Sequence, residues 1–262
     1  MSELVIREDD GPVTTLTLNN PDKLNALSCA MLTALHDTLD ALAVDRSVGT
    51  IVLRGAGRAF CAGHDLREIA DARQAPDGGR RFFDDLFARC GRMMVAITRQ
   101  PQPVIAEVTG VAAAAGCQLV ASCDMALAAQ TATFGVNGVD IGFFCSTPMV
   151  ALSRNIARKQ AFEMLTTGGF ISAGKAADLG LINRAVPQEA LSGEVRALAD
   201  RLTRKLPAAI RIGKEAFYAQ AEMTLDAAYA YTGRVASENL MLRDTAEGIA
   251  AFVEKRNPDW AQ

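Results

Sequence analysis

Two segments rich in glycine and alanine decide the fold of this chain: Gly57-Arg58-Ala59-Phe60-Cys61-Ala62-Gly63-His64-Asp65-Leu66-Arg67 and Gly110-Val111-Ala112-Ala113-Ala114-Ala115-Gly116-Cys117-Gln118-Leu119. Each follows an apolar stretch that predicts a strand, and each runs toward a helical pattern. Small side chains at such junctions let a ligand approach the backbone, where the first N–H groups of a helix are unpaired. Two such N–H groups converging on one oxygen form an oxyanion hole. For either segment alone, close packing of a helix on a strand is the alternative explanation.

Away from these segments, the hydrophobic pattern divides the chain into two parts. Apolar stretches of strand length alternate with amphipathic helices in the first half, and after residue 147 the pattern is almost entirely helical. The expected strands are 13–18, 50–53, 104–108, 125–129 and 184–186. The expected helices are 28–42, 80–99, 117–121, 147–166, 172–179, 188–206, 207–222, 224–242 and 244–255. This order predicts an α/β (α+β) fold, with a core over 1–200 and a helical region over 201–262.

The composition restricts the partners and the compartment. A net charge of −3 over 262 residues gives no reason to expect nucleic acid or an anionic membrane surface as a partner. No apolar run reaches the roughly 18–20 residues that a membrane span needs. The N-terminal segment is acidic and lacks the pattern of a signal or transit peptide. The six cysteines have no C-x-x-C spacing, and no His/Cys/Asp cluster has metal-ligand spacing. We therefore predict a cytoplasmic protein with reduced thiols, no membrane partner and no metal.

Several motifs, in order along the chain, resemble the enoyl-CoA hydratase/isomerase (crotonase) superfamily. They are Asn20-Pro21 with Lys23-Leu24-Asn25-Ala26-Leu27, Ala59-Phe60-Cys61-Ala62-Gly63-His64-Asp65-Leu66, Gly116-Cys117-Gln118-Leu119 with Cys123-Asp124, Ile171-Ser172-Ala173 with Gly180-Leu181, and Ala251-Phe252-Val253-Glu254-Lys255-Arg256. The resemblance implies a crotonase-type spiral of ββα turns, with C-terminal helices that support a homotrimer or a dimer of trimers. It also implies an acyl-CoA thioester as the partner, so coenzyme A arrives as part of the substrate and no cofactor is bound permanently.

The same resemblance implies which residues form the site. The oxyanion-hole donors are the backbone N–H groups of His64 and Ala115, which would hold the thioester oxygen as an enolate forms. The residues implied to contact coenzyme A are Lys23, Leu24, Ala62, His64, Asp65, Leu66 and Arg67, with Phe252 and Lys255 from the last helix. For each lysine and arginine, a solvated surface charge is the alternative.

Two positions depart from the family's pattern. Hydration of an enoyl thioester needs water activated for attack at Cβ and a proton delivered to Cα, work that two carboxylates normally share. The first would follow the Gly-Cys pair, where this chain has Gln118, whose amide cannot exchange a proton usefully. The second would end an F-G-x-P-E segment, which here reads Phe134-Gly135-Val136-Asn137-Gly138. This departure resembles a subgroup of enoyl-CoA hydratase domain-containing proteins that lacks both glutamates.

Four side chains could stand in for the missing carboxylates. Asp140 lies two residues beyond Gly138, but it also suits a cap or a surface position. Ser146 has no base that would activate it, and Cys145 is more simply a buried thiol. The imidazole of His64 either reaches the site or forms local hydrogen bonds. The sequence therefore leaves the proton-transfer group open.

These observations support three hypotheses about function. The first is a crotonase-type enzyme that stabilises the enolate of an acyl-CoA but hydrates enoyl-CoA poorly. The second is a non-catalytic acyl-CoA-binding or regulatory protein, and the third is an acyl-CoA thioesterase. The retained oxyanion loops favour an enzyme, because binding alone does not require them. We also expect that restoring both acids, with Gln118→Glu and Gly138→Glu, would raise the rate of hydration.

Overall fold

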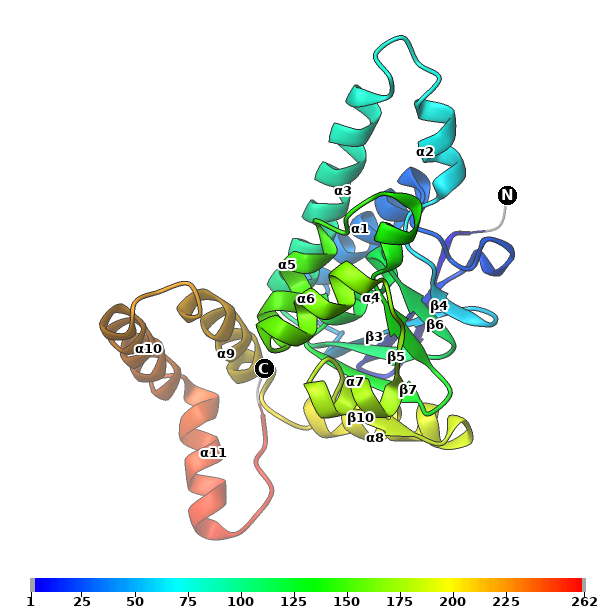
Figure 1. The fold of residues 1–262 in the computed structure, drawn as a ribbon. Helices are drawn as coiled ribbons and strands as arrows, with labels where there is room; N and C mark the ends of the chain where they lie inside the picture. Colours follow the sequence, from blue (N-terminus) through cyan, green and yellow to red (C-terminus); the bar gives the residue numbers. More distant parts are fainter. Residues whose placement is uncertain (1–2, 261–262) are drawn as a thin grey trace.

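The computed structural model of the chain describes residues 3–260, and a six-stranded sheet runs through its body (Figure 1). The strand order is β1-β2-β3-β5-β7-β10. Strand β1 is antiparallel to β2, and every other neighbouring pair is parallel. The bounds are β1 (Val5–Asp10), β2 (Val13–Leu18), β3 (Thr50–Gly55), β5 (Val104–Val108), β7 (Met125–Ala129) and β10 (Arg184–Val186).

A second sheet, in the order β4-β6-β8-β9, lies beside the first. Its strands are β4 (Ala59–Cys61), β6 (Val111–Ala113), β8 (Thr133–Gly135) and β9 (Ile171–Ser172). Three successive stretches of chain each give one strand to each sheet: β3 then β4, β5 then β6, and β7 then β8, with helical structure after each pair. The chain therefore winds in ββα turns, and the expected mixed α/β architecture with C-terminal helices is confirmed.

Alternating side chains of the parallel strands are buried on opposite faces of the large sheet. One face packs into the main core with α1 (Cys29–Ala43), α3 (Arg80–Arg99) and α4 (Ala115–Ser122), through residues that include Leu16, Leu18, Ile51, Leu53 and Ala106. The other face packs on α8 (Gln188–Thr203), through Val13, Val52, Ile105, Leu127 and Ala129. Because both faces of the sheet are covered, the sequences of its central strands are nearly continuous runs of apolar residues.

The expected single helix over 147–166 is wrong, because the structure has α5 (Pro148–Asn155) and α6 (Arg158–Thr167) there. Between them Ile156 and Ala157 are extended, with ψ of 161° and 140°. The amide of Asn155 donates to the carbonyl oxygen of Ala121 at 2.9 Å, and Ile156 is buried. Tertiary contacts therefore divide a segment whose local pattern is continuously helical.

The sequence prediction also missed several short elements: β1, β4, β6, β8, β9, α2 (Leu66–Ala72) and the 3-10 helix η2 (Asn137–Ile141). The turn that Pro21 and Asp22 predict is present as the 3-10 helix η1 (Pro21–Lys23). A three-residue strand is too short to show a period of two, and the edge strand β1 is mostly exposed. Helix α2 begins at a side-chain cap, where Asp65 accepts from the N–H of Arg67. Helix α4 begins at Ala115, two residues earlier than expected.

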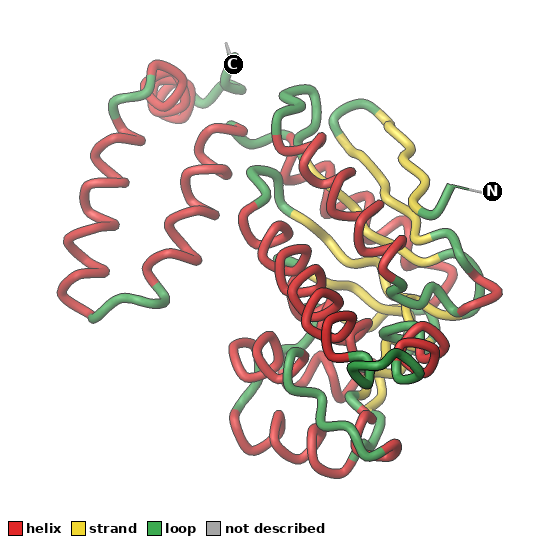
Figure 2. Tube along the Cα trace, turned by 90° about the horizontal axis from the view of Figure 1, so that it is seen from above, coloured by secondary structure: helices red, strands yellow, loops and turns green. Residues whose placement is uncertain are grey.

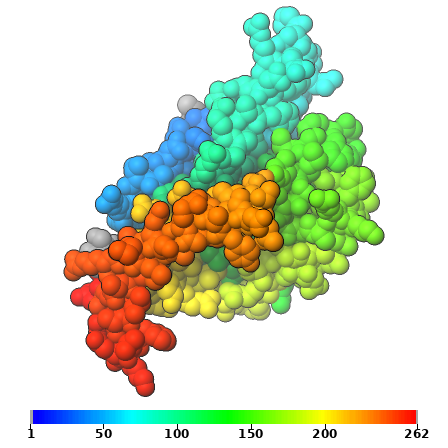
Figure 3. Space-filling model, turned by 90° about the vertical axis from the view of Figure 1, so that its left-hand side faces the viewer, coloured from blue at the N-terminus to red at the C-terminus, as the bar shows by residue number. Residues whose placement is uncertain are grey.

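Beyond α7 (Ala173–Leu179) and α8, the chain forms a C-terminal arm, residues 207–260, that leaves the core (Figures 1 and 2). The arm contains α9 (Pro207–Gln220), α10 (Leu225–Leu240) and α11 (Arg243–Glu254). In Figure 3 its red end projects beyond the outline of the core. Helix α10 has no buried residue within the chain. The boundary expected near residue 200 falls in the last turn of α8.

A buried ion pair fixes α9 to the core. Lys214 Nζ donates to the carbonyl oxygens of Ile97 and Gln102, both at 3.0 Å, and to Asp124 Oδ2 at 2.6 Å. The Tyr218 hydroxyl donates to Asp124 Oδ1 at 2.9 Å. The Lys214 side chain is 7% exposed, and burial lowers the pKa of its amine although Asp124 acts in the opposite direction. Removing either charge would leave the other buried without its partner.

We predict that Lys214→Met lowers the free energy of unfolding by about 3–5 kcal/mol, because Asp124 then keeps a buried, uncompensated charge. Urea unfolding at fixed protein concentration measures this loss. The double variant Asp124→Asn, Lys214→Met should recover part of it. The control is Arg80→Met, which removes the exposed pair with Asp84 and should change stability little. Equal losses in Lys214→Met and Arg80→Met would contradict the role of this pair.

Candidate functional site

Two loops leave the second sheet side by side. Strands β4 and β6 are parallel neighbours, with Cys61 paired to Ala112. Because the carboxyl ends of parallel strands lie at the same edge of a sheet, the segments 62–64 and 114–115 emerge together. The two glycine- and alanine-rich segments singled out in the sequence therefore meet in space.

The two loops approach each other closely at Gly63. A Cβ placed on Gly63, whose φ is 93°, would lie 3.0 Å from the Ala113 carbonyl oxygen and 3.3 Å from the Ala115 nitrogen. Within residues 3–260, the N–H groups of His64 and Ala115 have no hydrogen-bond acceptor. The arrangement can therefore present two free donors from adjacent loops to one ligand oxygen.

Ala114 turns the chain into α4. Its φ of 48° and ψ of −116° are unusual for a residue with a side chain, a conformation that costs of order 1–3 kcal/mol. The Ala114 N–H donates to Gly135 O at 2.8 Å, and its carbonyl accepts from the Gln118 N–H at 3.0 Å. Neighbouring segments thus hold Ala114 in this conformation, and α4 begins with the Ala115 N–H unpaired.

Gln118 follows Ala115 by three residues, on the same side of α4. Its side chain is 4% exposed, and its Oε1 atom is buried without a hydrogen-bond partner among the described residues. An amide here can hydrogen-bond to a ligand or orient a water molecule, but it cannot take up and return a proton.

The structure leaves no room for a carboxylate at the second position. Gly138 is buried in η2, and a Cβ there would lie 2.2 Å from the Phe143 carbonyl oxygen and 2.8 Å from Cys145 Sγ. The Phe143 N–H donates to Gly138 O at 2.9 Å, which holds the loop against the glycine. The expectation that Gly138→Glu would restore the acid is therefore wrong, because any side chain displaces residues 138–145.

Among residues 3–260, Asp140, Ser146 and Cys145 have no partner that would activate them for proton transfer. Asp140 is exposed and lies against Gly168, the residue that ends α6. A Cβ added to Gly168 would stand 2.8 Å from Asp140 Oδ1. The Ser146 hydroxyl donates only to Phe144 O, at 3.3 Å. Burial raises the pKa of the Cys145 thiol, which opposes a nucleophilic role. The described part of the chain contains no group of three His, Cys, Asp or Glu that could hold a metal ion.

A buried asparagine, to which the sequence analysis gave no role, holds the first loop. Asn25 is fully buried, and its amide donates to the carbonyl oxygens of Ala56 and Ala59, both at 2.8 Å. Its φ of 54° places it in a left-handed turn, a conformation that asparagine adopts more readily than most residues. Two residues later, the Leu27 N–H donates to Gly63 O at 2.7 Å. Asn25 therefore positions the turn that supports Gly63.

Most residues implied to contact coenzyme A come together beside this loop. Lys23 Nζ lies 2.9 Å from Asp65 Oδ2, and Asp65 also accepts from the Arg67 N–H at 2.9 Å. Burial opposes ionisation of Asp65, but the hydrogen bonds from Lys23 and from the Arg67 N–H keep the pKa of Asp65 below its usual value. The Ala62 N–H donates to Leu24 O at 3.0 Å. The gathered residues are Lys23, Leu24, Ala62, His64, Asp65, Leu66 and Arg67.

Two further candidates lie elsewhere in the chain. Phe252 and Lys255 are at the end of α11, which stands apart from α2 and β4 in Figures 1 and 2. Phe252 is 85% exposed and lines an open apolar hollow of about 320 Å³ with Trp260. One chain alone therefore does not bring these two residues to the paired loops.

The His64 ring extends the site with an aromatic wall that the sequence analysis missed. The ring meets Phe87 of α3 edge to face, with centroids 5.6 Å apart. Phe87 in turn stacks on Phe143, with centroids 5.9 Å apart. No motif signalled these contacts, because the two phenylalanines come from segments far apart in the sequence.

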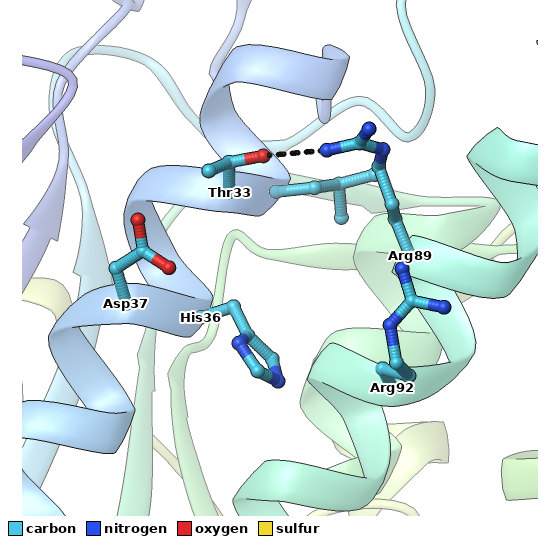
Figure 4. Close-up of a pocket in the computed structure, with 6 residues that line it drawn as sticks. Thr33, His36, Asp37, Arg89 and Arg92 are labelled. Carbon is cyan, nitrogen blue, oxygen red and sulfur yellow. Dashed lines mark hydrogen bonds between the residues drawn. The ribbon is translucent and has the colours of Figure 1, made fainter.

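A separate polar hollow of about 190 Å³ lies between α1 and α3 (Figure 4). It does not include either loop of the candidate site, and two of its lining residues, Arg89 and His36, have local partners. Arg89 pairs with Asp85 at 2.5 Å and donates to Thr33 at 3.2 Å, and His36 lies 3.4 Å from Asp40. The lining residues are Leu32, Thr33, His36, Asp37, Arg89 and Arg92.

Comparison with known proteins identifies relatives along nearly the whole chain. The family model for enoyl-CoA hydratase/isomerase matches residues 8–262. A Danio rerio protein named enoyl-CoA hydratase domain-containing protein 3, mitochondrial, is 42% identical over 260 residues, covering 99% of this chain and 88% of the relative. The Homo sapiens protein of the same name is 42% identical over 255 residues, covering 97% of this chain and 82% of the relative.

The predicted cytoplasmic localisation is contradicted by these relatives, whose names assign them to mitochondria. The prediction rested on the charge of the N-terminal segment and on reduced cysteines, and neither observation separates one reducing compartment from another. Within residues 3–260, no helix has both the length and the hydropathy of a membrane span.

Solved structures agree in fold over the same length. The crystal structure of a Mycobacterium smegmatis enoyl-CoA hydratase superposes with a TM-score of 0.95 at 50% identity, covering all of both chains. That of human enoyl-CoA hydratase domain-containing protein 3 gives a TM-score of 0.93 at 39% identity, covering 98% of this chain and all of that one. Taken with the paired loops, these matches show that the chain belongs to the enoyl-CoA hydratase/isomerase family and has the crotonase fold.

Proposed function

We propose that the protein binds an acyl-CoA thioester and stabilises its enolate, with the carbonyl oxygen between the N–H groups of His64 and Ala115. The observation that supports this proposal is the close approach of the two loops: a Cβ on Gly63, the residue before His64, would lie 3.3 Å from the Ala115 nitrogen. Such donors act on charge that develops during the reaction, and losing one typically costs about 10²–10³ in rate.

The coenzyme A moiety would lie beside the first loop, along Lys23, Leu24, Ala62 and the segment 64–67. Arg67 is exposed on the first turn of α2 and Lys23 is half exposed, so both can contact phosphate oxygens. Phe252 and Lys255 would contribute from the arm of a neighbouring subunit, because they lie away from the loops of their own chain.

A non-catalytic acyl-CoA-binding role is the second candidate. It is favoured by Gln118 and Gly138, which stand where the resemblance implies carboxylates, and by the tight loop that closes the second position. The two candidates share the binding site and differ in whether the bound thioester loses or gains a proton.

We predict that acyl-CoA thioesters raise the melting temperature and that the free acids do not. At a ligand concentration of about 100 times Kd, binding raises the free energy of unfolding by about 2.7 kcal/mol. For a chain of this size, that gain raises Tm by about 5–10 °C. Differential scanning fluorimetry with acetyl-CoA, crotonyl-CoA and longer acyl-CoAs measures it. Lys23→Gln should reduce the shift, and Lys175→Gln, exposed on α7, is the control. No shift with any thioester would refute the proposed binding.

We also predict slow hydration of crotonyl-CoA by the wild type, because a positioned acid or base contributes about 10²–10⁴ in rate and two are missing. Loss of the conjugated thioester absorbance measures the rate. Gln118→Glu should raise it only slightly, since one acid without its partner restores little. Gly138→Ala should lower stability by about 1–3 kcal/mol through overpacking. Rapid hydration by the wild type would show that another residue supplies both proton transfers.

We propose further that the arm assembles the chain into a trimer or a dimer of trimers. Helix α10 has no buried residue, and its apolar side chains Leu225, Tyr229 and Leu240 are 72%, 73% and 59% exposed. Exposed apolar side chains gathered along one helix mark an interaction surface. A closed ring of subunits would cover this face in every copy.

Light scattering should therefore give a mass of three or six chains of 27.8 kDa. The double variant Leu225→Glu, Tyr229→Glu should dissociate the assembly, because it places charges on the proposed contact. The matched control is Val44→Glu, which changes an 81% exposed valine after α1 and should leave the mass unchanged. A wild-type monomer at micromolar concentration would be the contrary result.

A further inference from the structure

The imidazole of His64 is held in one tautomer. Its Nδ1 atom lies 3.3 Å from the Leu27 carbonyl oxygen, which can only accept a hydrogen bond, so Nδ1 carries the hydrogen. In the neutral ring, Nε2 then carries the lone pair. This atom is buried and has no hydrogen-bond partner among the described residues. The ring thus presents a free acceptor nitrogen at a fixed position.

This nitrogen belongs to the same residue as one of the two proposed oxyanion-hole donors, the His64 N–H. The ring therefore lies within a side chain's length of a thioester held there. Leu27 fixes the ring and also holds the loop, through its N–H bond to Gly63 O at 2.7 Å. Phe87 covers the ring edge to face. The contacts that orient the imidazole are therefore those that build the hole.

We propose that His64 is the catalytic base, with Nε2 removing a proton from Cα of the bound acyl-CoA. The inference rests on the proposed function. The Cα–H bond breaks, and its electron pair forms the enolate C=C bond while the charge moves to the thioester oxygen. The proton bonds to Nε2, giving an imidazolium whose Nδ1–H still donates to Leu27 O. Return of a proton to Cα completes the cycle, with no oxidation and no other reactant.

The surroundings of the ring suit this role. Burial lowers the pKa of His64, although the Leu27 carbonyl opposes this, so the neutral base predominates near pH 7. An enolate held by the adjacent N–H groups would offset the cost of the buried imidazolium while the two charges coexist. Gln118 cannot perform the step, because an amide takes up no proton near neutral pH. This chemistry gives enolisation without hydration and does not need the two absent carboxylates.

Hydrogen exchange at Cα of butyryl-CoA in D₂O tests the proposal, since a saturated acyl chain cannot be hydrated. The wild-type protein, in its own assembly, should incorporate deuterium well above the protein-free rate, as measured by mass spectrometry. His64→Gln keeps the backbone N–H but removes the base, and it should slow exchange by about 10²–10⁴. The matched control is His36→Gln, which replaces the only other histidine and should exchange at the wild-type rate.

Calorimetric binding of butyryl-CoA separates this proposal from the one on which it rests. Binding with deuterium incorporation that falls in His64→Gln supports the role of His64. Binding without exchange in the wild type, or undiminished exchange in His64→Gln, overturns it and leaves acyl-CoA binding intact. Absence of binding overturns both proposals. If His64→Gln fails to fold by circular dichroism, His64→Ala with added imidazole replaces it, and exchange that imidazole does not restore overturns the role.

Discussion

The parallel pairing of β4 with β6 is the constraint on which the candidate site depends. Each strand has only three residues, yet their pairing brings two loops to one edge of the second sheet. Everything placed there, including the His64 and Ala115 N–H groups, follows from the shared direction of these strands. The larger sheet makes the pairing possible, because β3 and β5 deliver the chain to the starts of β4 and β6 from neighbouring positions.

Close approach at this edge is stabilised from outside the loops. Gly63 has no side chain to hold the loops apart, while Ala114 accepts an unfavourable conformation because hydrogen bonds from two segments fix it. Asn25 and Leu27 secure the first loop from an earlier stretch of chain. The site thus combines local strain with rigid support, the arrangement expected where backbone groups must be positioned before a ligand arrives.

The arm has the opposite character. Lys214 and Asp124 fix its first helix to the core, but within the described residues α10 has no buried side chain. Phe252 and Lys255 consequently lie away from the paired loops of their own chain. A single subunit therefore contains the two N–H groups proposed as oxyanion donors and most of the residues proposed to contact coenzyme A, and the proposed set would be completed by a neighbouring arm.

The sequence by itself determined the fold class and the two loops, because these depend on apolar periodicity and on runs of small residues that are local in the chain. The family followed from the resemblance of several motifs, in order along the chain, to a known superfamily. Motif positions also identified Gln118 and Gly138 as departures from the pattern. Only the tertiary structure decided what surrounds them. The closure of the loop over Gly138, the division of α5 from α6 and the aromatic wall of Phe87 and Phe143 all arise from contacts between distant segments. The free lone pair of His64 also depends on such a contact, since the Leu27 carbonyl that fixes its tautomer lies 37 residues earlier in the chain.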